Sequence, residues 1–176
     1  MIKKYKPKVV AVSSEMMGDV ADFVGNENHS VSLLEGDQGI NTIAAAEEVD
    51  IVIAGIAGAA GFASTVAAIK AGKKVLIANK EPLVMLGGLL QKLVAESGAQ
   101  IMPIDSEHNA IFQCLPAAAQ VDCTSGGIDK IHGLKEYGVR GIILTASGGP
   151  FLNTPLGGMS EITPNQAASH PRWTMG

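Results

Sequence analysis

Four short apolar segments rich in β-branched residues recur along the chain, and they constrain its fold more strongly than any other feature of the sequence. They occupy residues 8–12, 50–54, 74–78 and 100–104. Each is about one strand long and almost continuously apolar, which is typical of strands buried on both faces of a parallel sheet. From the second segment onward their starts lie roughly 25 residues apart, which predicts strand–helix–strand units with right-handed crossovers.

Helical patterns fill the stretches between these segments. The candidate helices span residues 15–24, 40–48, 62–71 and 83–97. The last two are followed by Gly72 and Gly98, which suit helix C-caps. The chain is 47% hydrophobic but only 4% aromatic, with 21 glycines in 176 residues, and this mixture fits close-packed α/β units better than a sandwich or a disordered chain. We therefore expect an α/β fold with a Rossmann-like, mostly parallel sheet flanked by helices.

The strand–helix rhythm changes after residue 104. A helical pattern, a glycine-rich polar stretch and an apolar strand pattern follow at residues 106–115, 122–137 and 139–146. Thr163 and Gln166 then form a capping box at the start of a short helix, which Pro171 would end. We place a domain boundary near residue 104 and expect the start of an α+β domain beyond it.

Charge, cysteine usage and hydropathy exclude several classes of protein. The net charge is −4 and the basic residues are mostly scattered, which argues against nucleic-acid binding. Cys114 and Cys123 form neither a CxxC pair nor a dense framework, as suits a reducing compartment. No apolar run reaches the ~18 residues of a membrane helix, and the apolar stretch Val9–Val12 is too short for a signal peptide. We expect an intracellular protein without a nucleic-acid or membrane partner.

Polar clusters follow the predicted strands, at the points where open α/β sheets bind their ligands. The clusters are Gly55–Gly61, Asn79–Glu81, Asp105–His108 and Ser147–Gly149. Because the carboxyl ends of parallel strands meet at one edge of a sheet, we expect at least the first three clusters to lie together.

The first two clusters each have a functional and a purely structural interpretation. The turn Gly55–Gly61 lets backbone amides approach a ligand at a helix N-terminus, but Ala57 replaces the second glycine of a GxGxxG motif, so a simple tight turn is equally possible. Lys80 can hold an anionic or hydroxylated substrate, or it can pair with Glu81 at the surface.

The third cluster is the most informative. Asp105 and Glu107 place two carboxylates two residues apart, where both can bind one hard divalent cation. His108 can donate a hydrogen bond or help to transfer a proton. The alternative is a helix N-terminus that Asp105 or Ser106 caps and whose acids favour the dipole. A third protein ligand is expected if a metal binds.

Four motifs resemble the 1-deoxy-D-xylulose 5-phosphate reductoisomerase family. They are ANKEPLV at 78–84, PIDSEHNAIFQ at 103–113, LTASGGPF at 144–151 and TPNQAASHPRWTMG at 163–176. The resemblance implies that residues 1–104 are the later part of an NADPH-binding Rossmann-like domain. Residues 105–176 would begin the metal- and substrate-binding catalytic domain.

The resemblance also assigns roles to individual residues. Asp105 and Glu107 would ligate Mg, Mn or Co. The catalytic residues would be Lys80, Glu107 and His108. Substrate contacts would come from Lys80, Ser106, Glu107, Ser147, His170, Trp173 and Met175. NADPH contacts would come from Ala57, Gly58, Ala59, Asn79, Glu81 and Gly176. The implied reaction rearranges a phosphorylated ketose, 1-deoxy-D-xylulose 5-phosphate, and reduces the product to 2-C-methyl-D-erythritol 4-phosphate, with charge stabilisation by the metal.

The resemblance further implies a homodimer for the full-length enzyme. Its place would be the cytoplasm of a bacterium, or a plastid in a plant or apicomplexan. The family's first strand and its Gly-Ser-Thr-Gly-Ser-Ile-Gly-type phosphate turn have no counterpart here, and a third metal ligand would follow Gly176. We therefore expect a truncated chain that is inactive alone. A non-catalytic Rossmann-like binding module is the main alternative. A different nicotinamide-dependent dehydrogenase fits less well, because simple hydride transfer needs no pair of metal-binding carboxylates.

Overall fold

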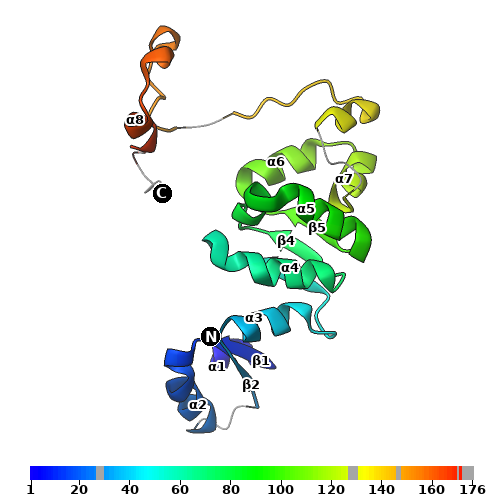
Figure 1. Ribbon diagram of the computed structural model, residues 1–176, viewed down its shortest axis with the longest axis vertical. Helices are drawn as coiled ribbons and strands as arrows, with labels where there is room; N and C mark the ends of the chain where they lie inside the picture. The colour runs from blue at the N-terminus through cyan, green and yellow to red at the C-terminus, as the bar shows by residue number, and fades with distance from the viewer. Residues whose placement is uncertain (27–29, 127–130, 146–147, 170, 172–176) are drawn as a thin grey trace. The chain divides into compact units, whose positions relative to one another are not determined.

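The computed structural model describes residues 1–26, 30–126, 131–145, 148–169 and 171 (Figure 1). The chain divides into two compact units, residues 1–140 and 141–176. The domain boundary that we place near residue 104 stays a prediction.

The first unit alternates strands with helices, as the sequence predicts. Its strands are β1 (Val9–Val12), β2 (Ser32–Glu35), β3 (Ile51–Ala54), β4 (Lys74–Ile77) and β5 (Gln100–Pro103). The helices around them are α1 (Ile2–Tyr5), α2 (Met17–Asn26), α3 (Gly36–Ala45), α4 (Phe62–Lys70), α5 (Glu81–Ser97), α6 (Ser106–Cys114) and α7 (Ala117–Thr124). Short 3₁₀ turns span Ser14–Met16, Gly58–Gly61 and Ile131–Tyr137.

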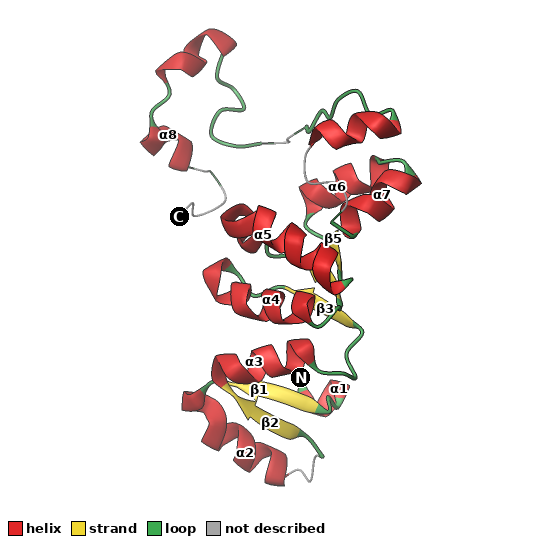
Figure 2. Ribbon diagram, turned by 45° about the vertical axis from the view of Figure 1, so that its right-hand side comes forward, coloured by secondary structure: helices red, strands yellow, loops and turns green. Residues whose placement is uncertain are grey.

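Every strand pairing in the described chain is parallel. β1 pairs with β2, and β3, β4 and β5 form a second sheet in that order. Helices α3, α4 and α5 lie side by side (Figures 1 and 2). The expected α/β fold with a mostly parallel sheet flanked by helices is confirmed.

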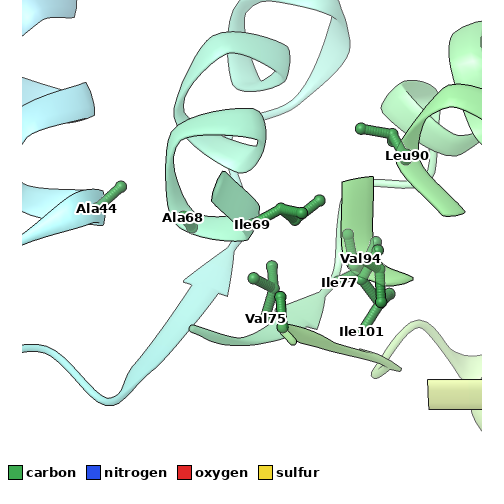
Figure 3. Packing of buried hydrophobic residues seen from close by; sticks show 9 residues of the cluster. Ala44, Ala68, Ile69, Val75, Ile77, Leu90, Val94 and Ile101 are labelled. Atoms are coloured by element: carbon green, nitrogen blue, oxygen red, sulfur yellow. The ribbon is translucent and has the colours of Figure 1, made fainter. Parts of the chain in front are cut away.

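The main hydrophobic core lies around β4, the central strand of the three-stranded sheet. Val75 and Ile77 of β4 are fully buried, with Ile69 of α4 and Leu90 and Val94 of α5 in the same cluster (Figure 3). Burying each such side chain contributes about 1.5–3 kcal/mol relative to leaving it in water. This packing fixes where β4 ends and where the residues after it begin.

The sheet edges of β1 and β3 differ from this buried centre. Among the described residues β1 pairs only with β2, and β3 only with β4. An apolar pocket of about 360 Å³ is lined by Ala11 of β1, by α3 and by β3. On β3 the side chains of Ile51 and Ile53 are 54% and 68% exposed. The predicted burial of this strand on both faces is therefore wrong in this structure, because Ile51 and Ile53 lie on the same face of the strand and that face is exposed.

The second unit contains one 3₁₀ turn, Leu156–Glu161, and the short helix α8 (Pro164–Ala168) within its described residues. The predicted capping box is confirmed. The Thr163 backbone N–H donates to Gln166 Oε1 over 2.8 Å, and the Gln166 N–H donates to Thr163 Oγ1 over 3.4 Å. The predicted strand at 139–146 is wrong for residues 139–145, where Ile143 is 92% exposed and no described strand pairs with the segment.

In the part of the chain that the structure describes, no helix has both the length and the apolar character needed to cross a membrane.

Candidate active site

Three polar clusters meet at one edge of the β3–β4–β5 sheet. The last residues of these strands, Ala54, Ile77 and Pro103, are in register with one another. Since the strands are parallel, the segments that follow them leave from the same edge. The predicted convergence of the glycine-rich turn, the Asn79–Glu81 segment and the Asp105–His108 segment is confirmed for the backbone.

The glycine-rich turn after β3 passes through the 3₁₀ turn Gly58–Gly61 into α4. Gly58 has a φ of +71°, a left-handed conformation that favours glycine. Ala57 and Ala59 are exposed and Gly58 is half-buried. These three residues are therefore at least partly accessible at the sheet edge, as a ligand contact requires.

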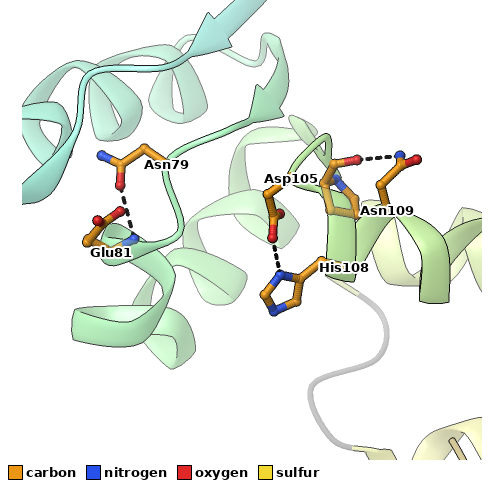
Figure 4. Close-up of polar contacts among 6 residues, drawn as sticks. Asn79, Glu81, Asp105, His108 and Asn109 are labelled. Atoms are coloured by element: carbon orange, nitrogen blue, oxygen red, sulfur yellow. Dashed lines mark hydrogen bonds and ion pairs between the residues drawn. The ribbon is translucent and has the colours of Figure 1, made fainter. Parts of the chain in front are cut away.

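Asn79 connects this turn to the start of α5. Its side chain is only 5% exposed. Its Nδ2 group donates to the carbonyl oxygens of Ile56 and Gly58, the latter over 3.0 Å. Its Oδ1 accepts from the Glu81 backbone N–H over 3.1 Å (Figure 4). The family resemblance implies a cofactor contact for Asn79. This structural connection was not predictable from the local sequence, because the carbonyl partners lie 21 and 23 residues earlier.

Lys80 and Glu81 are both exposed at the start of α5. The structure describes both residues, and no ion pair joins them. The alternative in which the two charges pair at the surface is therefore not observed. The Lys80 ammonium group is accessible to an anionic ligand at this edge.

Asp105 precedes α6 as its N-cap residue, with extended backbone angles, but its side chain makes no capping hydrogen bond. The carboxylate instead pairs with Nδ1 of His108 (Figure 4). The Asp105 side chain is 13% exposed and that of His108 is 57% exposed. The capping alternative is therefore right about backbone position and wrong about the side chain. An Nδ1–H that donates to Asp105 would orient its carboxylate.

Asn109 holds the same segment from the other side. Its Nδ2 group donates to the Pro103 carbonyl oxygen over 2.8 Å (Figure 4), and its backbone N–H donates to the Asp105 carbonyl oxygen over 2.9 Å. Its Oδ1 accepts from Gln113. No role was predicted for Asn109 from the sequence, although it directly follows His108 in α6.

The carboxylates after β5 supply some, but not all, of the protein ligands expected for a hard divalent cation. Asp105 and Glu107 offer two carboxylates, the ligand type that Mg and Mn prefer. Among the described residues no group of three or more His, Cys, Asp or Glu side chains is placed to hold a metal. The expectation that a third protein ligand is needed is consistent with this set. Glu107 and Ser106 are exposed in the first turn of α6.

Five residues assigned from the resemblance lie outside the described part of the chain. They are Ser147, His170, Trp173, Met175 and Gly176. Their assignments to substrate and cofactor stay predictions.

The shifted pKa values belong to a different place, the contact between α7 and the 3₁₀ turn Ile131–Tyr137. The Tyr137 hydroxyl donates to the Asp122 carboxylate. This hydrogen bond, followed by burial and nearby negative charge, raises the pKa of Tyr137. Burial, and secondarily the Asp122 charge, raises the pKa of the Cys123 thiol. A raised thiol pKa disfavours the reactive thiolate.

Sequence models of one enzyme family match most of the chain. The model described as 1-deoxy-D-xylulose 5-phosphate reductoisomerase matches residues 1–87, and the model of its C-terminal domain matches residues 101–176.

Curated relatives carry the same description. The protein from Pseudomonas putida (strain W619) is 54% identical over 147 residues, which are 84% of this chain and 34% of the relative. The protein from Stutzerimonas stutzeri (strain A1501) is 45% identical over 174 residues, which are 98% of this chain and 41% of the relative. The chain thus spans 34% to 41% of the length of these relatives.

Solved structures agree with the sequence relatives. A crystal structure of DOX-P reductoisomerase in complex with NADPH, fosmidomycin and magnesium superposes with a TM-score of 0.78 at 44% identity, covering 99% of this chain and 41% of that one. The Zymomonas mobilis enzyme in complex with NADPH gives a TM-score of 0.69 at 39% identity, covering 93% of this chain and 38% of that one.

Proposed function

Because the chain belongs to the 1-deoxy-D-xylulose 5-phosphate reductoisomerase family, we propose that it is part of an NADPH- and divalent-metal-dependent enzyme. The reaction converts 1-deoxy-D-xylulose 5-phosphate to 2-C-methyl-D-erythritol 4-phosphate, a step of isoprenoid precursor synthesis. Relatives solved with NADPH and magnesium support both cofactors. The whole reaction is proposed for a protein of the relatives' full length.

The observation that carries this proposal is the placement of two different chemistries on adjacent strand ends. The turn after β3 and the Asn79–Glu81 segment after β4 form the proposed cofactor side. The Asp105–His108 segment after neighbouring β5 forms the proposed metal side. Hydride transfer to a metal-bound substrate requires these two sides to be next to each other.

Each residue of this candidate site would then have its own role in the reaction. Residues 57–59 would approach the nicotinamide side of NADPH, which supplies the hydride. Lys80 holds an anionic or hydroxylated part of the substrate as a point charge. Asp105 and Glu107 hold the metal, which stabilises negative charge on the substrate oxygens when bound. His108 keeps the Asp105 carboxylate oriented through their hydrogen bond.

Further roles are proposed for residues outside the described part of the chain. Ser147 and His170 would bind the substrate with Ser106, His170 near its phosphate, and Trp173 and Met175 would cover it. Gly176 would contact NADPH. The family matches also support a functional boundary near residue 104, because the first ends at residue 87 and the second starts at residue 101.

The assembly and cellular place of the enzyme are also part of the proposal. A homodimer of the full-length enzyme follows from the family resemblance. The bacterial sources of the relatives support a bacterial cytoplasm.

Substrate-dependent oxidation of NADPH, followed by absorbance, tests the proposed function in a full-length reductoisomerase that carries these residues. We expect Asp105→Asn to lower turnover by about two to three orders of magnitude in saturating Mn, because a lost charge-stabilising group typically costs ~3–4 kcal/mol. Asp50→Asn, a change of the same kind just before β3, is the control and should retain turnover. Normal turnover in Asp105→Asn would contradict the metal assignment.

The same assay also addresses the 176-residue chain alone, for which we expect no turnover. The chain spans 34% to 41% of the length of its relatives. Its described residues bring no three or more His, Cys, Asp or Glu side chains together, whereas three protein ligands are expected for the metal. Activity proportional to the concentration of the purified chain, and abolished by Asp105→Asn, would contradict this expectation. NADPH binding without turnover by the full-length protein would favour the non-catalytic binding module.

A further inference from the structure

The Asn79 side chain is almost completely buried at an edge of the sheet where its neighbours Lys80 and Glu81 are exposed. It reaches back from the end of β4 to the turn that follows β3. Its Nδ2 group donates to the carbonyl oxygens of Ile56 and Gly58. A buried side-chain amide whose hydrogen bonds are nearly all made stabilises one arrangement of the backbone around it.

The hydrogen-bonding capacity of this side chain is nearly exhausted. A carboxamide has two N–H donors and one carbonyl oxygen with two lone pairs. Both Asn79 donors are used by the turn, and Oδ1 already accepts from the Glu81 N–H over 3.1 Å. The side chain therefore has no donor left for a phosphate or any other acceptor on a ligand. Its main contribution is to the protein backbone.

Gly61 shows independently how closely the turn fits around this side chain. A Cβ atom at Gly61 would lie 2.6 Å from Asn79 Nδ2 and still closer to the Ile56 carbonyl oxygen. Distances below about 3.0 Å force atoms to move. The carbonyl is backbone, so it cannot move away cheaply. Gly61 is also buried, and its own carbonyl oxygen accepts from Thr65 Oγ1 over 2.7 Å.

We propose that Asn79 and Gly61 form a clamp that holds the Gly55–Gly61 turn in its binding shape before any cofactor arrives. Asn79 is thus a positioning residue that acts through the turn, rather than a residue that acts only by touching NADPH. The link to NADPH rests on the proposed function, whereas the clamp itself does not. A turn that is already ordered lowers the free-energy cost of binding, because the backbone does not have to be ordered by the ligand.

Amide hydrogen exchange of the 176-residue chain without NADPH tests the clamp directly. Asn79→Asp keeps the size of the side chain and an acceptor for the Glu81 N–H, but removes the Nδ2 donors. We expect protection of the amides at residues 60–62, which close the 3₁₀ turn, to fall about tenfold or more, since the variant loses both Nδ2 hydrogen bonds and each lost net hydrogen bond is worth up to about one order of magnitude. Asn109→Asp makes the same change after β5 and should leave these amides protected.

Gly61→Ala should loosen the same amides, because the added Cβ displaces the Asn79 carboxamide. Both changes break the same contact, the one between the Asn79 carboxamide and the turn. The double variant should therefore lose less protection than the sum of the losses in the two single variants. Unchanged protection of residues 60–62 in Asn79→Asp, or fully additive losses, would overturn the clamp.

Steady-state kinetics of the full-length enzyme tests the positioning role. Asn79→Asp should raise KM for NADPH about tenfold and leave the apparent affinity for Mn unchanged, whereas general destabilisation would weaken both. A raised KM for NADPH without faster amide exchange would mean that Asn79 acts by direct contact alone. Faster amide exchange with an unchanged KM for NADPH would mean that the shape of the turn does not affect binding. Either result overturns the proposal. If the full-length protein oxidises no NADPH, the proposed function fails while hydrogen exchange still decides the clamp.

Discussion

At the scale of single residues, two carboxamides set the geometry of the candidate site. Asn79 follows β4 and Asn109 follows β5, and each donates to backbone carbonyl oxygens of a segment that precedes it in the chain. Asn109 also donates its backbone N–H to Asp105. The charged residues that would carry chemistry are therefore held by uncharged neighbours.

Asn109→Ala should loosen the segment that carries Asp105 and Glu107. The Pro103 carbonyl oxygen would lose its side-chain donor, which costs about 1–3 kcal/mol if no water replaces it. In the full-length enzyme we expect the Mn dissociation constant to rise about tenfold, as for other groups that orient metal ligands. A Mn titration measures this.

Asn153→Ala is the matched control, since Asn153 is exposed and lies in the second unit. Equal Mn affinities in the Asn109→Ala variant and the unmodified enzyme would show that the segment keeps its shape without the carboxamide.

The sequence predicted the charged members of the site but not the side chains that hold them. Asp105, Glu107 and Lys80 stand out because their charges follow predicted strands. The role of Asn79 depends on carbonyl oxygens 21 and 23 residues away, and no local pattern encodes such a contact. The pairing of Asp105 with His108 spans three residues. It could have been predicted, because residues three apart are neighbours on a helix.

At the scale of elements, strands with continuous apolar runs were predictable and those without were not. β4 and β5 match their predicted ranges closely. β2 (Ser32–Glu35) was missed, because only its two central leucines are apolar and its ends are exposed. The segment 139–145 has an apolar strand pattern but no described partner strand, and a strand needs such a partner for its backbone hydrogen bonds.

The hydrogen bond from Tyr137 to Asp122 ties the 3₁₀ turn Ile131–Tyr137 to α7. It raises the pKa of Tyr137 above the usual value of about 10. A tyrosine with a raised folded-state pKa stabilises the fold fully below the unfolded pKa and loses this contribution as the pH rises through the folded pKa. We therefore expect Tyr137→Phe to lower the Tm at pH 7, with the difference shrinking above about pH 10.

Thermal unfolding followed by circular dichroism at both pH values checks this prediction. Tyr5→Phe is the control, because Tyr5 is 65% exposed near the N-terminus. A Tm difference for Tyr137→Phe that stays constant across this pH range would contradict the proposed hydrogen-bond contribution.

At the scale of the whole molecule, the first unit combines a buried sheet centre with exposed sheet edges. β4 is covered on both sides by β3 and β5, while the β3 edge presents Ile51 and Ile53 beside an apolar pocket. Unpaired strand edges with exposed apolar side chains favour association with other chains. The sequence predicted apolar strands but not which edges are unpaired, because that depends on the pairing of segments far apart in the chain.

We expect the purified 176-residue chain to self-associate in a concentration-dependent way, as measured by sedimentation velocity. Ile53→Lys should weaken this association, because a lysine on a strand edge opposes edge pairing. Val84→Lys adds the same charge at a residue of α5 that is 81% exposed and should have a smaller effect. A chain that stays monomeric at high concentration, or equal effects of both changes, would contradict association through the β3 edge.

We propose that adjacent strand ends of this chain bring the cofactor and the metal of a reductoisomerase together. Anomalous X-ray diffraction from a full-length enzyme carrying these residues, crystallised with Mn and NADPH, tests it most directly. We expect a Mn peak within about 2.2 Å of carboxylate oxygens of both Asp105 and Glu107, with the nicotinamide against residues 57–59. A Mn peak bonded to neither carboxylate, or a nicotinamide away from the turn after β3, would show that these strand ends do not form the site.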